Sequence, residues 1–238
     1  MGRRLLSNSY REHQVDLMGY FQILRRIAQN NDTTSFASSF RRKRWAIFQD
    51  IVESLPRPIK ILDVGGTTNY WANHHLLDES GIEITIINHE PQSYRPNNIS
   101  FVKGDARNMK NFKDNEFDIV FSNSVIEHVG TFEHQKKMAD EIIRVGKRYF
   151  IQTPNYFFPI EPHFLIPFFQ FLPMSIRAWL VSHYKLGWHK KATDISSAHA
   201  IVSQISLLRK KELMILFPDA KLVREKIMGL TKSFMVIR

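Results

Sequence analysis

The feature that most constrains this 238-residue chain is a repeating order of short apolar segments and helical patterns. Each apolar segment ends in glycine or polar residues, and helical spacing separates most of the segments from one another. Such alternation is typical of a parallel sheet covered by helices on both faces. The strands expected from this repeat are 59–64, 82–87, 99–102, 117–121 and 147–152.

The segments on either side of this repeat have other patterns. Apolar spacing predicts further helices, with a polar linker over 30–39, and two alternating runs at the end predict an antiparallel hairpin. We therefore expect an α/β fold with a doubly wound, seven-stranded sheet that is mostly parallel and closes with the hairpin. The further helices are expected over 10–29, 45–55 and 201–217, and the hairpin strands over 221–227 and 231–237.

Composition excludes several classes of protein. The chain has no cysteine, which rules out disulfide scaffolds, thiolate nucleophiles and cysteine-ligated zinc. It has 33 Lys and Arg against 23 Asp and Glu, and this net charge of +10 favours anionic partners or a basic solvated surface. No apolar span is long and uncharged enough for a transmembrane helix, and no signal-peptide pattern precedes residue 11. A cytoplasmic protein is therefore expected.

Glycines follow the first expected strand, at the edge where an open parallel sheet binds ligands. Gly65 and Gly66 allow a tight turn and let a ligand lie against bare backbone. The third glycine of the dinucleotide fingerprint is absent, since Thr67 and Asn69 occupy the following positions. The loop therefore suits an adenosine-like ligand that carries no phosphate.

Polar residues follow the next two strands. Asn88, which can donate and accept, and Glu90, which only accepts, stand where a side chain would meet the hydroxyls of a ribose, and a solvated turn is the alternative. Asp105 can accept from the exocyclic amine of an adenine while the neighbouring backbone N–H, at Ala106, donates to a ring nitrogen. Together these residues predict a nucleoside-binding edge.

The order of the segments ILDVGG, IINHE, GDA, SNSVIEH and IQTPN resembles class I S-adenosylmethionine-dependent methyltransferases of the type-11 group. The resemblance covers roughly residues 40–155 and implies a Rossmann-like fold with S-adenosylmethionine as cofactor. This chain departs from the family pattern at Asn88, where an acidic residue is usual. The site residues that the resemblance implies are Asp63, Gly65 and Gly66 at the methionine end, Asn88 or His89 at the ribose, Asp105 with Ala106 at the adenine, and Ser122 near the sulfonium.

Two histidines are candidates for a general base, because imidazole is the commonest one near neutral pH. His128 follows the fourth strand, and His163 follows Glu161, which could orient its ring. The alternatives are that His128 only positions a ligand and that the Glu161 segment caps a helix. The spacing of the histidines matches no metal motif, so no metal is expected.

These observations favour methyl transfer to a small-molecule acceptor, as in an O-methyltransferase of glycan or secondary-metabolite biosynthesis. The alternatives are an RNA-directed methyltransferase and a non-catalytic module that binds an adenosyl ligand. Nucleic acid is less favoured but left open by the basic charge, because the run 41–44 lacks interleaved aromatic residues. The segment 155–195, which follows the fifth expected strand as an insertion, is rich in apolar residues. It suits an apolar acceptor, internal packing or a homodimer surface.

We expect one domain, because a chain of this length can bury roughly 70–75% of its unfolded surface in a single core. Its parts are expected to be an N-terminal helical extension over 1–39, a cofactor-binding core over 40–154, a helical lid insertion over 155–195, and a helix plus hairpin over 196–238.

Overall fold

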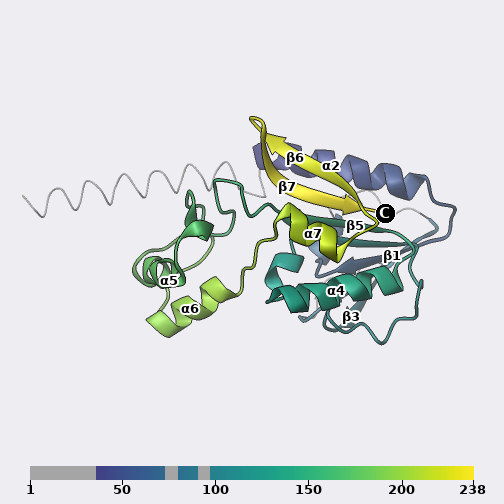
Figure 1. Cartoon of the computed structure of the whole chain (residues 1–238). Helices are drawn as coiled ribbons and strands as arrows, with labels where there is room; N and C mark the ends of the chain where they lie inside the picture. Colours follow the sequence, from purple (N-terminus) through teal and green to yellow (C-terminus); the bar gives the residue numbers. More distant parts are fainter. Residues whose placement is uncertain (1–35, 73–79, 91–96) are drawn as a thin grey trace, which may run out of the picture. The chain divides into compact units, whose positions relative to one another are not determined.

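The computed structural model describes residues 36–72, 80–90 and 97–238, so the helix expected over 10–29 lies outside the described residues. The described residues fall into two compact units (Figure 1). The smaller unit contains residues 36–47 and Pro159–His199, and the larger contains Phe48–Phe158 and Ala200–Arg238. The whole sheet belongs to the larger unit.

The sheet has seven strands in the order β3-β2-β1-β4-β5-β7-β6. The five strands β1 to β5 are parallel, and β7 runs antiparallel to both β5 and β6. The expected mostly parallel sheet with a terminal antiparallel hairpin is confirmed. The strands are β1 (Ile59–Val64), β2 (Ile82–Asn88), β3 (Ile99–Lys103), β4 (Ile119–Asn123), β5 (Tyr149–Pro154), β6 (Lys221–Ile227) and β7 (Leu230–Ile237).

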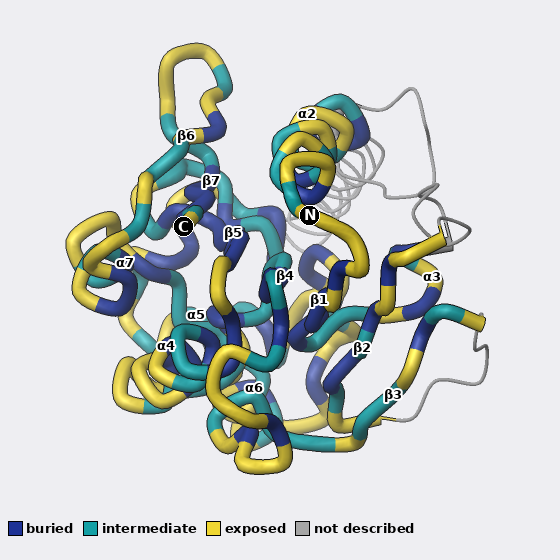
Figure 2. The backbone as a smooth tube through the Cα atoms, turned by 90° about the vertical axis from the view of Figure 1, so that its right-hand side faces the viewer, coloured by how far each residue is buried: buried dark blue, intermediate teal, exposed yellow. Residues whose placement is uncertain are grey.

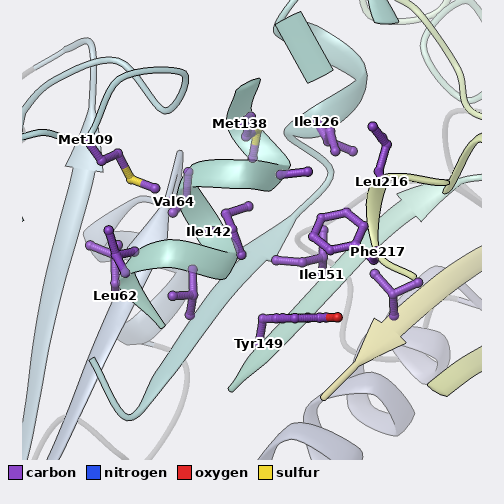
Figure 3. Close-up of a cluster of buried hydrophobic side chains, with 14 of the residues drawn as sticks. Leu62, Val64, Met109, Ile126, Met138, Ile142, Tyr149, Ile151, Leu216 and Phe217 are labelled. Carbon is purple, nitrogen blue, oxygen red and sulfur yellow. The ribbon is translucent and has the colours of Figure 1, made fainter. Parts of the chain in front are cut away.

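Helices α4 (Phe132–Val145) and α7 (Lys210–Leu216) contribute to the main apolar core (Figure 3). Met138 and Ile142, four residues apart, point from α4 toward the strands because residues at this spacing share a helix face. They belong to one buried cluster with Leu62, Ile151 and Phe217. Figure 2 shows this burial along the central strands. The core holds the carboxyl ends of β1, β4 and β5 in a fixed arrangement.

Aromatic side chains form a second buried group, to which β4, β5 and helices α2 (Phe36–Glu53) and α3 (Thr68–Ala72) contribute. The rings of Phe121 and Phe150 stack with centroids 5.7 Å apart, and Phe48 packs on Phe121 at 4.7 Å. Trp71 adds an edge-to-face contact with Phe121 at 5.6 Å. Offset and edge-to-face ring pairs of this kind add to the stability that burial alone provides. The group fixes α3 beside the end of β1.

The remaining helical elements are short. The larger unit contains the 3₁₀ turn η2 (Ile126–His128), and the smaller contains η3 (Phe169–Phe171) and α5 (Met174–His183). Helix α6 (Ile195–Ser203) continues from the smaller unit into the larger. Among the described residues, no helix is both long and apolar enough to cross a bilayer.

The expected helix over 201–217 is wrong, because α6 and α7 are separate helices. The backbone of Ser206, between them, donates to the carbonyl of Glu127 and accepts from Gln135 Nε2 at 2.8 Å each. These long-range hydrogen bonds replace the ones that a continuous helix would make. The spacing of apolar residues does not reveal that groups distant in the sequence compete with the helix for these backbone hydrogen bonds.

Other boundaries also differ from expectation; the fifth strand, for example, is Tyr149–Pro154 and not 147–152. The segment expected as linker up to residue 39 is helical from Phe36, and the burial of Phe40 explains why the helix starts early. The fourth strand begins at Ile119 and not at residue 117, because Phe117 forms only an isolated bridge with Gly146.

Candidate functional site

The strand order changes direction beside β1, which has β2 on one side and β4 on the other. In open α/β sheets, ligands bind at the carboxyl ends of the strands at such a point. The ends of β1, β2, β3 and β4 therefore define the candidate site. All of these strands lie in the larger unit.

Asp63 on β1 is the most unusual charged residue at this edge. Its side chain is buried, and Trp71 Nε1 donates to Oδ2 over 2.6 Å. The other oxygen, Oδ1, is buried and has no hydrogen-bond donor among the described residues. Burial raises the pKa of Asp63 to about 7, against the opposing effect of the Trp71 hydrogen bond. A carboxylate with one unsatisfied oxygen is suited to accept from a cationic donor.

The turn after β1 requires the two glycines for different reasons. Gly65 has a φ of +77°, in the left-handed region, and a Cβ there would lie 2.6 Å from Val125 Cγ1. At Gly66 a Cβ would lie only 1.6 Å from Asp63 Oδ2. The carboxylate of Asp63 therefore lies directly against the bare backbone of Gly66.

Asn88, at the end of β2, binds the glycine turn. Its Nδ2 donates to the carbonyls of Gly65 at 3.3 Å and Gly66 at 3.0 Å, and its Oδ1 accepts from the backbone N–H of His89. The amide thus supports the loop with both of its polar atoms. The side chain of His89 is exposed at the same edge.

Asp105, after β3, forms a two-pronged ion pair with Arg107. Nε and Nη2 of Arg107 donate to the carboxylate at 2.7–3.0 Å, and the Arg107 backbone N–H donates to Oδ1. Arg107 Nη1 also donates to the carbonyl of Val129 at 3.4 Å. These hydrogen bonds lower the pKa of Asp105 and hold it ionised. Ala106, between the two partners, is half-buried.

The two candidate residues after β4 differ in exposure. Ser122 is fully buried, and its Oγ donates to the carbonyl of Val64 over 3.1 Å. It therefore joins the ends of β4 and β1 directly. His128, in η2, is exposed.

Residues 62–149 match the family model described as a methyltransferase domain. This part of the chain is therefore similar to methyltransferase domains, in agreement with the resemblance to S-adenosylmethionine-dependent methyltransferases noted in the sequence. The match spans β1 to the start of β5 and therefore includes every strand end described above.

Comparisons with individual proteins cover other shares of the chain. A 56-residue stretch is 39% identical to an uncharacterised protein of Mycobacterium tuberculosis, and it covers 24% of this chain and 19% of that protein. The stretch thus spans about a fifth of the length of that relative. A SAM-dependent methyltransferase structure from Methanosarcina mazei is 15% identical over 79% of this chain and 95% of that one, with a TM-score of 0.46. A SAM-dependent methyltransferase structure from Aquifex aeolicus is 12% identical over 82% of this chain and 87% of that one, with a TM-score of 0.47.

The residues of the methyltransferase domain fit S-adenosylmethionine, which is the cofactor of this class. The unsatisfied Asp63 Oδ1 offers an acceptor for the ammonium group of the methionine portion. The bare backbone at Gly65 and Gly66 lets Val125 and the Asp63 carboxylate lie directly against the turn, and the ionised Asp105 offers an acceptor for an adenine amine. When bound, the cofactor supplies a methyl group on a sulfonium.

The smaller unit contains the other candidate catalytic residues. Glu161 is buried, and its Oε1 lies 2.6 Å from Nδ1 of His163. Its Oε2 accepts from the backbone N–H groups of His163 and Phe164 at 2.7 Å each. Glu161 therefore orients the imidazole and closes a local turn; the alternative that it caps a helix is wrong, because residues 162–164 form a turn.

His189 is a further imidazole in the smaller unit. Its ring stacks on Phe164 with centroids 4.8 Å apart. Burial lowers the pKa of His189, and the nearby His163 lowers it further. The stacked rings of His189 and Phe164 therefore form an aromatic surface next to the Glu161–His163 pair, and the lowered pKa favours the neutral form of His189.

Sequence reasoning missed Trp71 and Arg107. The signal for Arg107 was an arginine two residues after Asp105, a spacing that permits a local ion pair. Trp71 carried no comparable signal, because its contact with Asp63 depends on the angle at which α3 leaves the glycine turn.

Proposed function

We propose that this protein transfers a methyl group from S-adenosylmethionine to a small-molecule acceptor. The observation that carries the proposal is the buried carboxylate of Asp63, whose Oδ1 lacks a donor among the described residues and lies beside the glycine turn. The ammonium group of the methionine portion supplies the missing donor. A charge-assisted hydrogen bond in a buried site is among the stronger ones that a protein forms.

The remaining cofactor contacts follow from the strand ends. We assign the ribose contact to His89, whose side chain is exposed, while Asn88 holds the glycine turn in shape. Asp105 accepts from the adenine amine, and the backbone N–H of Ala106 donates to the ring. Ser122 closes the pocket through its link between β4 and β1.

For an oxygen acceptor, we assign the general base to His163. When Nδ1 of His163 carries the hydrogen that Glu161 accepts, Nε2 is the basic nitrogen. Nε2 would then take the proton of an acceptor hydroxyl, and S-adenosylmethionine, when bound, would supply the methyl group. His128 is the second candidate for this role. An O-methyltransferase of glycan or secondary-metabolite biosynthesis uses such an acceptor.

The decisive experiment is calorimetry of the purified chain with S-adenosylhomocysteine, the demethylated product. We expect saturable one-site binding that Asp63→Asn weakens at least tenfold, while NAD gives no binding heat. Asp118→Asn is the matched control, because Asp118 accepts from Lys60 and Lys147 away from the carboxyl edge. Failure of the natural chain to bind S-adenosylhomocysteine would overturn the proposal.

The acceptor class needs its own measurement. Incubation of a metabolite extract with labelled S-adenosylmethionine is expected to label small molecules, with the label on oxygen. Label in RNA would support the RNA-directed alternative, which the net charge of +10 favours. Binding without any transfer would support a non-catalytic adenosyl-ligand module.

The organisation of the whole protein is part of the same proposal. We retain one domain with the boundaries expected from the sequence, a cytoplasmic location and no resident metal. The insertion exposes several large apolar side chains, which suits an apolar acceptor or a homodimer surface. Light scattering with and without S-adenosylhomocysteine tests the dimer.

A further inference from the structure

Helix α5 in the smaller unit presents an unusual outer face. Ile176 and Trp179 are 45% and 48% exposed, whereas Ala178 and Val181 on the other side of the helix are buried. The spacing of Ile176, Trp179 and His183 places all three on one face. An amphipathic helix in water normally directs its large apolar residues inward, so this face lacks a partner among the described residues.

Ring contacts extend this face beyond the helix. Trp179 stacks on His183 with centroids 4.5 Å apart and meets Tyr184 edge to face at 6.0 Å. Tyr184 is itself exposed. The three rings and Ile176 therefore form one continuous exposed apolar surface, which we call the α5 patch. Exposed apolar patches of this kind mark interaction sites more often than single exposed residues do.

Cations follow the α5 patch along the chain. Lys185, Lys190 and Lys191 are exposed, and none of them has an ion pair with another described residue. Helix α5 contains Arg177 and no acidic residue. Trp188, exposed between these lysines, donates from Nε1 to the carbonyl of Pro162 at 3.2 Å. Aromatic rings and cations thus alternate over 176–191.

We propose that the α5 patch is a peripheral docking surface for an anionic lipid bilayer. Tryptophan and tyrosine rings prefer the level of the lipid headgroups, where one part of the ring is apolar and another is wet. The lysines that follow these rings in the chain attract the phosphates and carboxylates of anionic lipids. The surface carries this function whether or not the protein transfers methyl groups, so its test uses no cofactor.

Two observations favour lipid over single-stranded RNA as the occupant. One face of the Trp179 ring is already covered by His183, so a base could stack only on the remaining face and could not insert between open rings. Ile176 adds aliphatic area that contributes little to stacking but favours insertion among acyl chains. Binding of RNA is therefore an outcome against the proposal.

The test is co-sedimentation of the full chain with vesicles of phosphatidylcholine alone or mixed with phosphatidylserine. We expect binding to the mixed vesicles that falls as salt is raised. Lys190→Gln with Lys191→Gln is expected to weaken binding about 25-fold, since each of the two cations near an anionic surface contributes roughly a fivefold factor. The matched control is Lys110→Gln with Lys113→Gln, which removes the same charge from exposed positions in the larger unit.

The apolar contribution is tested with Ile176→Ser and Trp179→Ser together, against Ile215→Ser on α7 as an exposed control. We expect roughly tenfold weaker binding for the pair and no change for the control. Vesicles of brominated phosphatidylcholine mixed with phosphatidylserine give a second readout. They should quench the tryptophan fluorescence of the natural chain much more than that of Trp179→Phe, a variant that keeps an apolar ring in place.

Three results would overturn the proposal. The first is absence of binding to mixed vesicles at low salt. The second is an equal loss in the Lys110 and Lys113 control, which would mean that net charge alone drives association. The third is equal quenching of the natural chain and Trp179→Phe. If the first result comes with salt-dependent binding of single-stranded RNA, the occupant of the patch is RNA and not lipid.

Discussion

Trp71 donates its indole N–H to Oδ2 of Asp63 over 2.6 Å, and both side chains are buried. The indole satisfies one carboxylate oxygen and leaves the other for a ligand. Burial outweighs this single hydrogen bond, which is why the pKa of Asp63 is raised to about 7. The free protein therefore carries a carboxyl group that is half-ionised near neutral pH, at the point where we propose a cationic ligand group.

The first prediction concerns stability and pH. The folded chain keeps a proton on Asp63 up to about pH 7, whereas the unfolded chain releases it near 3.8. Stability from this group is therefore complete below about pH 4 and is lost as pH rises through 7, by at most about 4 kcal/mol. Asp63→Asn should remove that loss. Urea unfolding of both proteins at pH 5 and pH 8 measures this difference. If the unfolding free energy of Asp63→Asn changes with pH as much as that of the natural chain, the prediction is contradicted.

The second prediction concerns Gly66. A methyl group at this position would lie 1.6 Å from Asp63 Oδ2, so Gly66→Ala must displace the carboxylate. We expect a loss of about 1–3 kcal/mol in unfolding free energy, as for other overpacked sites. Binding of S-adenosylhomocysteine should also be lost. Gly229→Ala is the control, because nothing lies within 4 Å of its Cβ position; it should cost stability through its φ of +83° but leave binding intact.

The third prediction concerns Arg107. Removing its guanidinium in Arg107→Ala raises the pKa of Asp105 toward its ordinary value and frees the carboxylate to rotate. We expect S-adenosylhomocysteine to bind about tenfold more weakly, and Arg107→Lys to recover only part of the loss because lysine cannot form the two-pronged pair. S-inosylhomocysteine, which lacks the exocyclic amine, should bind all three proteins alike. A tenfold loss with that analogue too would show that Arg107 acts only on the fold.

The fourth prediction concerns the Glu161–His163 pair. His163→Ala should lower methyl transfer to the acceptor by ~10² or more with unchanged affinity for S-adenosylhomocysteine. Glu161→Gln keeps an acceptor for the backbone N–H groups of His163 and Phe164 but weakens the hold on the ring, so its pH–rate profile should shift. Near-normal turnover in His163→Ala would remove this residue from the catalytic role and leave His128 as the candidate.

The fifth prediction concerns Arg144 on α4, which supports the loop after β3. Its guanidinium donates to Glu141, to Asp114 and to the carbonyls of Met109 and Phe112. Arg144→Gln should lower the unfolding free energy by about 2–4 kcal/mol, because several of these acceptors are then left without a donor. Urea unfolding measures this. The exposed Arg148→Gln is the control, and a similar change in both variants would contradict the prediction.

Arg144 also affects stability in acid. Its hydrogen bonds lower the pKa of Glu141 below 4.5, so the stability from this carboxylate is present above that value and is lost as pH falls further. Arg144→Gln should flatten that acid loss.

The order of the elements and the edge that holds the ligand followed from local signals. The apolar runs that became β1, β2 and β3 are bounded by glycine and polar residues, and their carboxyl ends meet at one edge in any parallel arrangement. The hairpin of β6 and β7 was predictable for the same reason, because alternation and a turn are properties of neighbouring residues.

Local signals were insufficient wherever a distant group competes for the backbone. The helix expected over 201–217 breaks at Ser206 because Glu127 and Gln135 bind its backbone. Likewise Asn88 occupies a position typical of ribose binding, yet its amide is used by the carbonyls of Gly65 and Gly66.

The sequence by itself determined which residue types stand at the strand ends, and hence the resemblance to methyltransferase domains. Tertiary structure decided what those residues can do. The contact between Asp63 and Trp71, and the orphaned oxygen that it leaves, depend on how α3 packs against the aromatic group beside β4 and β5. Burial and contact distance arise only when segments far apart in sequence pack together, and it is they that set charge state and hydrogen-bond partners.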